Sequence, residues 1–151
     1  MPNKELPRVV IDTNIYISAI FWGGLPRKVV DMGVDDPVQL RLRSYQIFTS
    51  FEIIEEIQST LNKKFRLSKE HSENIVRDIL TFSEIVSPPP HIAFIPKDPD
   101  DEKFINCEIA CRAHFLVSGD MHLRRLRSSG DIRIIGPREF LEAIEKKSLL
   151  L

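Results

Sequence analysis

The chain has 151 residues, of which 42% are hydrophobic and 28% are charged, and its formal net charge is −1. This length suits one domain with a sizeable core and is too short for two, and the composition is that of an ordinary globular protein. The net charge does not favour nucleic-acid binding by the surface as a whole, so such binding would need a local basic patch.

The amino end and the two cysteines favour a cytoplasmic protein without a membrane partner. The opening MPNKELPR is polar, and the apolar run after it is interrupted by Asp12 and Asn14, so no signal peptide is expected. No segment approaches the length of a membrane-spanning helix. Cys107 and Cys111 lack the spacing of a zinc site and are expected to be buried, reduced thiols.

Short β-branched runs alternate with helical periodicity along the first third of the chain. RVVI at 8–11 predicts a buried strand, and residues 13–22 predict a helix after it. A short helix is expected after the GGLP break, with Pro26 as its first residue. Segment 35–44 has two interpretations, because its charges and proline favour a connecting loop whereas VQLRL alternates like a strand.

The same alternation continues through the middle of the chain. Residues 45–50 predict a second strand, and Ser50 is expected to cap a helix that ends near residue 65. Ser68 is expected to cap the next helix, which is followed by a short strand within 84–90. Prolines end that strand.

The last third predicts a helix over 101–113, a strand over 115–118, a short helix, a strand over 131–136 and a final helix. Strands therefore alternate with helices throughout, which favours a parallel sheet covered on both faces. The expected fold is α/β, a three-layer α/β/α sandwich around a central, mostly parallel sheet of about five strands. Because no repeat or linker is evident, residues 1–151 are expected to form a single domain.

Four acids fall where they can converge at one edge of this sheet. Asp12 directly follows one predicted strand, and Asp120 follows another after Gly119. Glu56 lies in the helix after another strand, and Asp101 opens a helix. Ligands of parallel sheets bind outside the carboxyl ends of the strands. Carboxylates without Cys or His partners suit a hard cation such as Mg²⁺ or Mn²⁺, and a metal held in this way commonly serves phosphate-ester chemistry.

Each of these acids also has a purely structural interpretation. Asp12, Asp101 and Asp120 can cap the adjacent helices or interact with their dipoles. Glu56 can lie on a solvated helix face. A functional role is favoured for Asp12 and Asp120, because they share a strand-end position and an unpaired buried charge would be costly. Asp101 is preferred to Asp100, because apolar residues follow it at i+3 and i+4 on the inward face.

Charged residues near the acids also have two interpretations. Glu108 is expected to pair with Arg112 at i+4, and the alternative is a role as an additional acid near the site. Several arginines follow Asp120 closely and form either a solvated basic face or a set of contacts that hold phosphates beside the site. These arginines are Arg124, Arg125 and Arg127.

The ordered motifs resemble the PIN-domain ribonuclease family. The matching pieces lie within residues 8–120 and are VVIDTN, TSFEIIEEIQSTL, DPDDEKFINCEIACRA and FLVSGD. The later stretch IRIIGPREFLEAI is similar to the last strand and helix of the family. The resemblance is nearest to the short, single-domain prokaryotic members, many of which are regarded as toxins of toxin–antitoxin pairs.

This resemblance implies a metal-dependent endoribonuclease that hydrolyses RNA phosphodiesters. It implies four catalytic acids that also hold one or two Mg²⁺ or Mn²⁺ ions, namely Asp12, Glu56, Asp101 and Asp120. It also implies supporting residues, namely Asn14 and Ser118 through hydrogen bonds and Asp98 as a nearby acid. The implied partners are RNA, a cognate antitoxin protein and a second copy of the chain, with Arg124, Arg125 and Arg127 as candidate RNA contacts.

Other functions are compatible with parts of the pattern. A PIN-fold module that binds RNA or protein without cleaving would be marked by the loss of an acid, and none of the four is lost. A haloacid-dehalogenase-type enzyme would need an acid in place of Asn14, and a response regulator would need a lysine after a late strand. Neither is evident, since no such lysine follows Val117. The sequence departs from the family at segment 35–44, which is longer or more polar than usual, and at Glu108, where small apolar residues are common.

Overall fold

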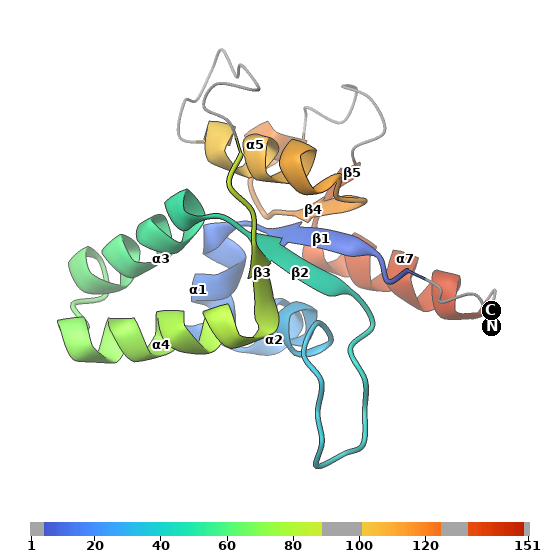
Figure 1. Cartoon of the computed structure of the whole chain (residues 1–151), viewed down its shortest axis with the longest axis horizontal. Coiled ribbons are helices and arrows are strands. Elements are labelled where there is room, and N and C mark those ends of the chain that lie inside the picture. Colours follow the sequence, from blue (N-terminus) through green and yellow to red (C-terminus); the bar gives the residue numbers. More distant parts are fainter. Residues whose placement is uncertain (1–4, 89–100, 125–132, 150–151) are drawn as a thin grey trace.

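The computed structural model describes residues 5–88, 101–124 and 133–149, and a five-stranded sheet lies at its centre. All neighbouring strands run parallel, in the order β3-β2-β1-β4-β5 (Figure 1). The strands are β1 (Arg8–Ile11), β2 (Gln46–Thr49), β3 (Ser83–Ile85), β4 (Phe115–Val117) and β5 (Arg133–Ile135). The predicted sheet is confirmed, and every pairing within it is parallel.

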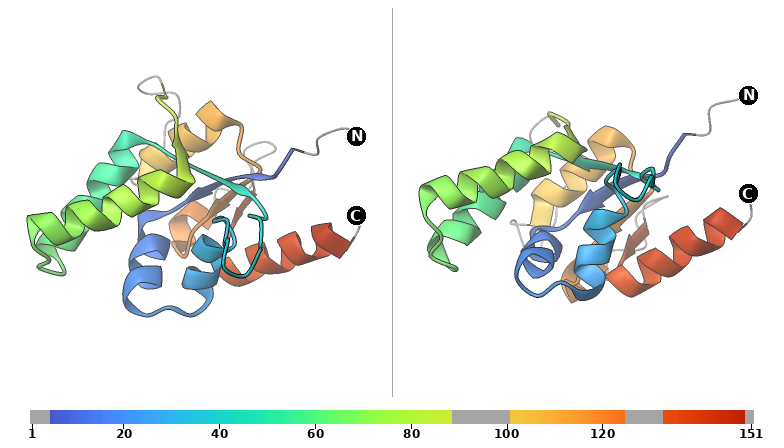
Figure 2. Two further views of the ribbon diagram at one scale, coloured as in Figure 1. Left: turned by 60° about the horizontal axis from the view of Figure 1, so that its bottom comes forward. Right: turned by 90° about the horizontal axis from the view of Figure 1, so that it is seen from below.

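Helices cover both faces of this sheet. They are α1 (Thr13–Phe21), α2 (Gly24–Asp31), α3 (Phe51–Lys63), α4 (Lys69–Phe82), α5 (Glu102–Cys111), α6 (Met121–Arg124) and α7 (Pro137–Leu149). Figure 2 shows α1, α2 and α7 on one face and α5 on the other, while α3 and α4 form a hairpin that extends beyond the sheet. The predicted α/β/α layering is confirmed. No helix in the described ranges is long and apolar enough to cross a membrane.

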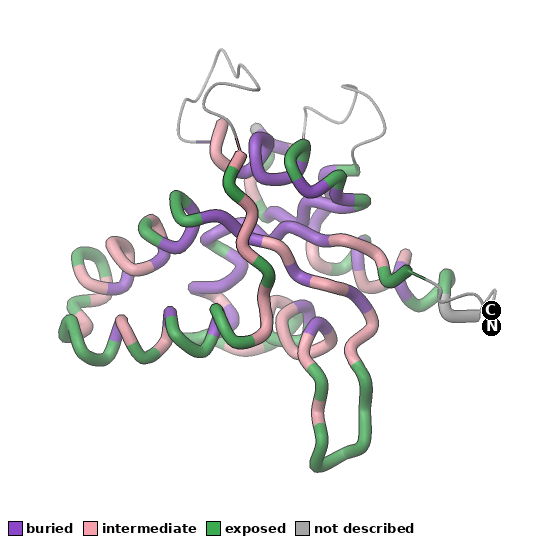
Figure 3. Tube along the Cα trace, in the orientation of Figure 1, coloured by how far each residue is buried: buried purple, intermediate pink, exposed green. Residues whose placement is uncertain are grey.

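The core is centred on β1, which pairs with β2 on one side and β4 on the other. Val9 and Val10 of this strand have no exposed surface. Figure 3 shows buried positions following the central strands. A strand with neighbours on both sides and helices on both faces is apolar throughout, which explains why RVVI lacks the alternation of a half-exposed strand.

Capping serines mark the starts of α3 and α4. The Ser50 and Ser68 hydroxyls each accept the backbone N–H three residues further on, so both predicted caps are confirmed. The start of α2 differs from the prediction. Gly23 has a positive φ of 70°, and α2 begins at Gly24, so Pro26 is the third residue of this helix and not the first.

The segment between α2 and β2 is a projecting loop, as one of its two interpretations predicted (Figure 1). Along this fully described segment the only bridge pairs Asp36 with Arg41, and an ion pair of 3.2 Å joins Asp35 to Arg43. Its alternating apolar side chains are between 81% and 90% exposed, namely Val38, Leu40 and Leu42. Alternation did not produce a strand of the sheet here, because nothing covers the apolar side.

The end of α5 contradicts one sequence prediction. The helix ends at Cys111, and Arg112 turns the chain in the left-handed conformation at a φ of 54°. Glu108 is fully buried and Arg112 is exposed, so the predicted ion pair between them is wrong. Neither carboxylate oxygen of Glu108 has a hydrogen-bond partner among the described residues. Cys107 and Cys111 are buried free thiols, as predicted.

Candidate active site

Asp12 lies at the carboxyl end of β1 and is only 3% exposed. Its backbone N–H donates to the carbonyl of Val117 at 3.0 Å, so the chain stays joined to β4 at this point. Asp12 occupies the N-cap position of α1, but its carboxylate makes no capping hydrogen bond. Instead, its Oδ2 accepts a hydrogen bond from Ser118 Oγ at 2.6 Å. The carboxylate therefore has a hydrogen-bond partner in the residue that follows the neighbouring strand β4.

Ser118 connects Asp12 to Asp120. This serine directly follows β4 and is fully buried. Its hydroxyl donates to Asp12, and the same oxygen accepts the backbone N–H of Asp120 at 3.0 Å. Through one side chain, the structure thus brings both strand-end acids to the same edge of the sheet.

The acids around Asp12 influence its ionisation. Burial raises the pKa of the Asp12 carboxyl above its ordinary value, and the negative charges of Glu56 and Asp120 raise it further. The hydrogen bond from Ser118 and the backbone of Asn14 oppose this rise. The Asn14 side chain itself is exposed. Asp12, Glu56 and Asp120 therefore share one electrostatic environment. We use the name acidic edge for these three residues and Asp101.

Glu56 of α3 forms an ion pair with Lys103 of α5. The two side chains are 29% and 17% exposed, so Glu56 does not lie on a freely solvated helix face. Sequence reasoning missed Lys103. The two residues are 47 positions apart, and only the packing of α3 against α5 brings them together. No spacing within a single segment could have indicated this pair.

Asp101 directly precedes α5 and is 7% exposed. It occupies the N-cap position, yet its side chain makes no capping hydrogen bond. Phe104 and Ile105 are buried, in agreement with the inward face predicted for this side of the helix. Asp98 and Asp100 lie outside the described residues.

The donor chemistry of the acidic edge fits a hard divalent cation, because its side chains offer only oxygen atoms. Thr13 Oγ1 and Thr49 Oγ1, near the ends of β1 and β2, are also buried without a hydrogen-bond partner in the described ranges. The described part of the chain nevertheless contains no group of three or more His, Cys, Asp or Glu side chains placed to hold a metal ion. In this arrangement Glu56 is engaged by Lys103.

One of the three candidate RNA-contact arginines is described, and it is engaged within the protein. Arg124 donates to Glu139 Oε1 at 2.9 Å, and its side chain is 27% exposed. This ion pair joins α6 to α7. Arg125 and Arg127 lie outside the described residues.

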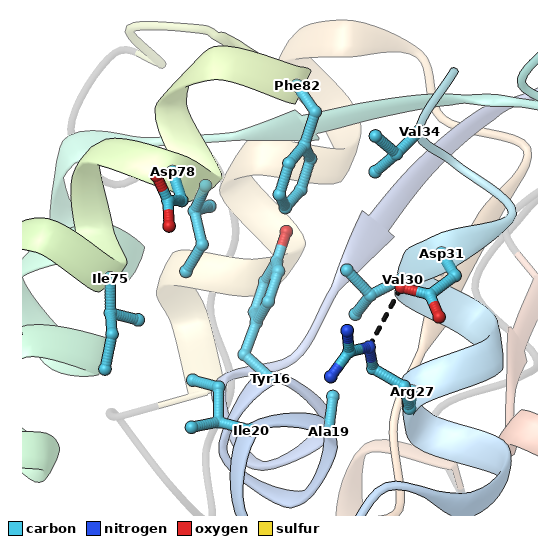
Figure 4. A pocket seen from close by; sticks show the side chains of 11 residues that line it. Tyr16, Ala19, Ile20, Arg27, Val30, Asp31, Val34, Ile75, Asp78 and Phe82 are labelled. Carbon is cyan, nitrogen blue, oxygen red and sulfur yellow. Dashed lines mark hydrogen bonds and ion pairs between the residues drawn. The ribbon is translucent and has the colours of Figure 1, made fainter. Parts of the chain in front are cut away.

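A separate hollow of about 350 Å³ lies between α1, α2 and α4 (Figure 4). Tyr16 points into it and is 2% exposed, and its hydroxyl has no hydrogen-bond partner within the described ranges. Burial raises the pKa of this hydroxyl. An ion pair of 3.0 Å between Arg27 and Asp31 lies beside the hollow. None of the four acids lines it, so the hollow is distinct from the acidic edge.

Comparison with known proteins gives a family and a fold. A family model described as PIN domain matches residues 8–122. The "Uncharacterized protein MJ1680" of Methanocaldococcus jannaschii is 30% identical to this chain in an alignment of 151 positions that covers 92% of each protein.

Three solved structures share the fold. VapBC2 from Rickettsia felis, bound to a DNA fragment from its promoter, has a TM-score of 0.60 at 16% identity and covers 85% of this chain and 98% of its own. VapBC-1 from nontypeable Haemophilus influenzae has a TM-score of 0.60 at 14% identity, and the match covers 87% of this chain and 98% of that chain. The T. brucei RRP44 PIN domain has a TM-score of 0.52 at 12% identity, and the match covers 95% of this chain and 85% of that chain. With the family match, these findings show that the chain belongs to the PIN domain family.

Proposed function

We propose that this protein is a cytoplasmic, metal-dependent endoribonuclease that consists of a single PIN domain over residues 1–151. The observation that carries this proposal is the buried Asp12, which Ser118 links to Asp120 at the carboxyl ends of β1 and β4. Buried acids with interacting charges are common at functional sites. Membership of a family with a nuclease fold supports the activity, and the buried free thiols support the cytoplasmic location.

The acidic edge is proposed to hold Mg²⁺ or Mn²⁺ and to act in catalysis through Asp12, Glu56, Asp101 and Asp120. A divalent ion bound there would lower the pKa of a water molecule and offset the negative charge that develops on the RNA phosphate. Ser118 orients the Asp12 carboxylate and holds the backbone of Asp120 beside it. Supporting roles for Asn14 and Asp98 are proposed from the family resemblance.

The proposal extends to a role as the toxin of a toxin–antitoxin pair. Two of the structural neighbours are VapBC proteins, from Rickettsia felis and Haemophilus influenzae. We assign RNA as the substrate, an antitoxin protein as a partner that covers the acidic edge, and a second copy of the chain as a further partner. Co-expression with the product of the adjacent gene tests the antitoxin, and a neighbouring product that neither binds nor inhibits the chain would argue against this role.

A non-catalytic module that binds RNA or protein is the second candidate. It is favoured by the engagement of Glu56 with Lys103, and by the finding that no group of three possible metal ligands is assembled among the described residues. The presence of all four acids in the sequence favours the nuclease instead.

Cleavage of a mixed RNA panel by the purified protein, with Mg²⁺, Mn²⁺ or EDTA, separates the two candidates. The nuclease proposal predicts metal-dependent cleavage that falls at least about a hundredfold in an Asp12→Asn, Asp120→Asn double variant. Glu52→Gln, which changes an exposed acid on the same helix as Glu56, is the matched control and keeps full activity. Cleavage that survives the double variant would refute the site. RNA binding without cleavage in any metal would favour the binding module.

A further inference from the structure

Three aromatic rings contact one another near the end of α1 and the connection between α3 and α4. Phe21 stacks on Phe65 with ring centroids 4.3 Å apart, and Trp22 meets the edge of Phe65 at 5.9 Å. Phe21 also contacts Trp22, at 5.8 Å. Phe65 is partly buried, whereas Trp22 is 70% exposed. Two rings thus hold a tryptophan whose own surface is open to solvent.

Cations flank the Phe65 member of this aromatic cluster in the sequence. Lys63, Lys64 and Arg66 are exposed neighbours of Phe65, and none of the three forms an ion pair in the ranges that the structure describes. Lys69 follows and contacts Glu73 only at 3.9 Å, with 85% of its side chain exposed. The stretch 62–69 contains no acid. The surface is therefore locally basic on a chain whose net charge is −1.

We propose that these residues form a platform for single-stranded RNA, with Trp22 as the surface on which a base stacks. Aromatic rings next to lysines and arginines bind single strands, because bases stack on the rings while the cations contact the phosphates. This inference rests on the proposed function, since it assigns an RNA contact to the same enzyme. We name the platform by its six residues, Phe21, Trp22, Lys63, Lys64, Phe65 and Arg66.

The platform is connected to the acidic edge by two helices. α1 begins directly after Asp12 and ends at Phe21, and α3 carries Glu56 in its first half and ends two residues before Phe65 (Figure 1). A helix of nine residues such as α1 is roughly 13 Å long, which a stacked single strand spans in about four nucleotides. The platform can therefore hold RNA that flanks the bond at the acidic edge.

The charge around Trp22 favours RNA over a protein surface as its occupant. A protein partner would cover the exposed aromatic ring equally well, but it would also have to match several unpaired cations with acids. A polyanion supplies that match along its whole length. A second copy of this chain would bring the same positive charge and would be repelled.

Fluorescence of Trp22, the single tryptophan of the chain, gives a direct readout. A short uridine-rich RNA is titrated into the protein in EDTA, so that binding is measured without metal-dependent cleavage. The platform predicts quenching of Trp22 on binding. It also predicts that Trp22→Ala weakens RNA binding roughly tenfold or more and that Trp22→Phe restores part of this affinity. Binding by these variants is measured by the anisotropy of labelled RNA. Duplex RNA, whose bases are already stacked, competes poorly.

Charge reversal tests the basic half of the platform. A Lys64→Glu, Arg66→Glu double variant is expected to lower the slope of log affinity against log salt by about 1.4, because two phosphate contacts are lost. The matched control reverses two exposed lysines on α7, Lys146 and Lys147, and leaves the slope unchanged. Val38→Ala, at a position that is 90% exposed, is the control for removal of an exposed apolar side chain.

The outcomes separate this proposal from the proposed function. Quenching of Trp22 in wild type, with weakened RNA binding in Trp22→Ala, supports the platform even if no RNA is cleaved. Wild-type RNA affinity in all platform variants, together with unchanged quenching of Trp22 in the Lys64→Glu, Arg66→Glu variant, would overturn it, whether or not the protein cleaves RNA. Sedimentation that shows a dimer in wild type and a monomer in Trp22→Ala, with unchanged RNA binding, would also overturn it in favour of an interface between two copies.

Discussion

Two buried acids, Asp12 and Glu108, differ in what surrounds their carboxylates. Asp12 accepts a hydrogen bond from Ser118 at 2.6 Å and lies near other acids, at the carboxyl end of a strand. Glu108 lies on the buried face of α5 with no partner for either oxygen in the described residues, and burial, with a smaller effect from Cys111, raises its pKa to about 8. Burial alone therefore does not identify a site. Polar partners at a strand end make Asp12 the better candidate for chemistry.

The largest predicted effect is the pH dependence that Glu108 gives to the stability of the fold. The pKa of a glutamate is ordinarily 4.5, and the folded state raises that of Glu108 to about 8. The folded state therefore binds the proton of Glu108 more tightly than the unfolded state does. The stabilisation of the fold by this proton is fully present below about pH 4.5 and is lost as the pH rises to about 8. The difference of about 3.5 between the two pKa values corresponds to at most about 5 kcal/mol in the free energy of unfolding.

Glu108→Gln should remove this dependence, because the amide does not ionise. Urea unfolding at about pH 5 and about pH 9 should show the variant to be more stable than wild type at the higher pH. RNA cleavage should be retained, in contrast to Asp12 variants. Glu145→Gln, at an exposed position on α7, is the control and should follow wild type. Equal pH dependence in wild type and Glu108→Gln would show that this acid is not kept protonated.

The next prediction tests Ser118, the hydrogen-bond partner that distinguishes Asp12 from Glu108. Ser118→Ala leaves Asp12 Oδ2 without the hydroxyl at 2.6 Å and should lower the free energy of unfolding by about 1–3 kcal/mol. It should also lower RNA cleavage, because the carboxylate loses its fixed direction. Ser72→Ala removes an equally buried hydroxyl that donates to a backbone carbonyl of α4 at 3.0 Å, and it should leave cleavage unchanged. Equal loss of cleavage in both variants would count against a specific role for Ser118.

The smallest effect concerns Lys103. Lys103→Met breaks the ion pair with Glu56 and should change the free energy of unfolding by about 1 kcal/mol or less, because both side chains are partly exposed. Calorimetry should show tighter Mn²⁺ binding, because Glu56 is released to the acidic edge. Lys69→Met, which breaks the exposed pair with Glu73, is the control without an effect on metal. Weaker Mn²⁺ binding in Lys103→Met would mean that the lysine is needed to position Glu56.

Local sequence patterns were sufficient to predict most of the fold. The apolar run of β1 and the capping serines Ser50 and Ser68 depend on neighbours along the chain, and the structure has them where the sequence indicated. Strand alternation in segment 35–44 was ambiguous, because the same pattern occurs in a loop when no second surface covers the apolar side.

The contacts of the candidate site were less predictable. The order of the acids indicated one edge of the sheet, but the Glu56–Lys103 pair depends on the packing of α3 against α5, and no periodicity encodes it. The expected pairing of Glu108 with Arg112 failed because the helix ends between them, at Cys111. Helix ends and contacts between distant segments are decided by tertiary packing, which a single sequence does not display.

The central claim is that Asp12 anchors a metal-holding acidic edge, and calorimetric titration of the full chain with Mn²⁺ tests it most directly. Wild type and Glu52→Gln should bind Mn²⁺ with the same affinity, whereas Asp12→Asn should lose most of that affinity while remaining folded by circular dichroism. Mn²⁺ binding by Asp12→Asn that equals wild type, or no binding by any of the three proteins, would contradict the account.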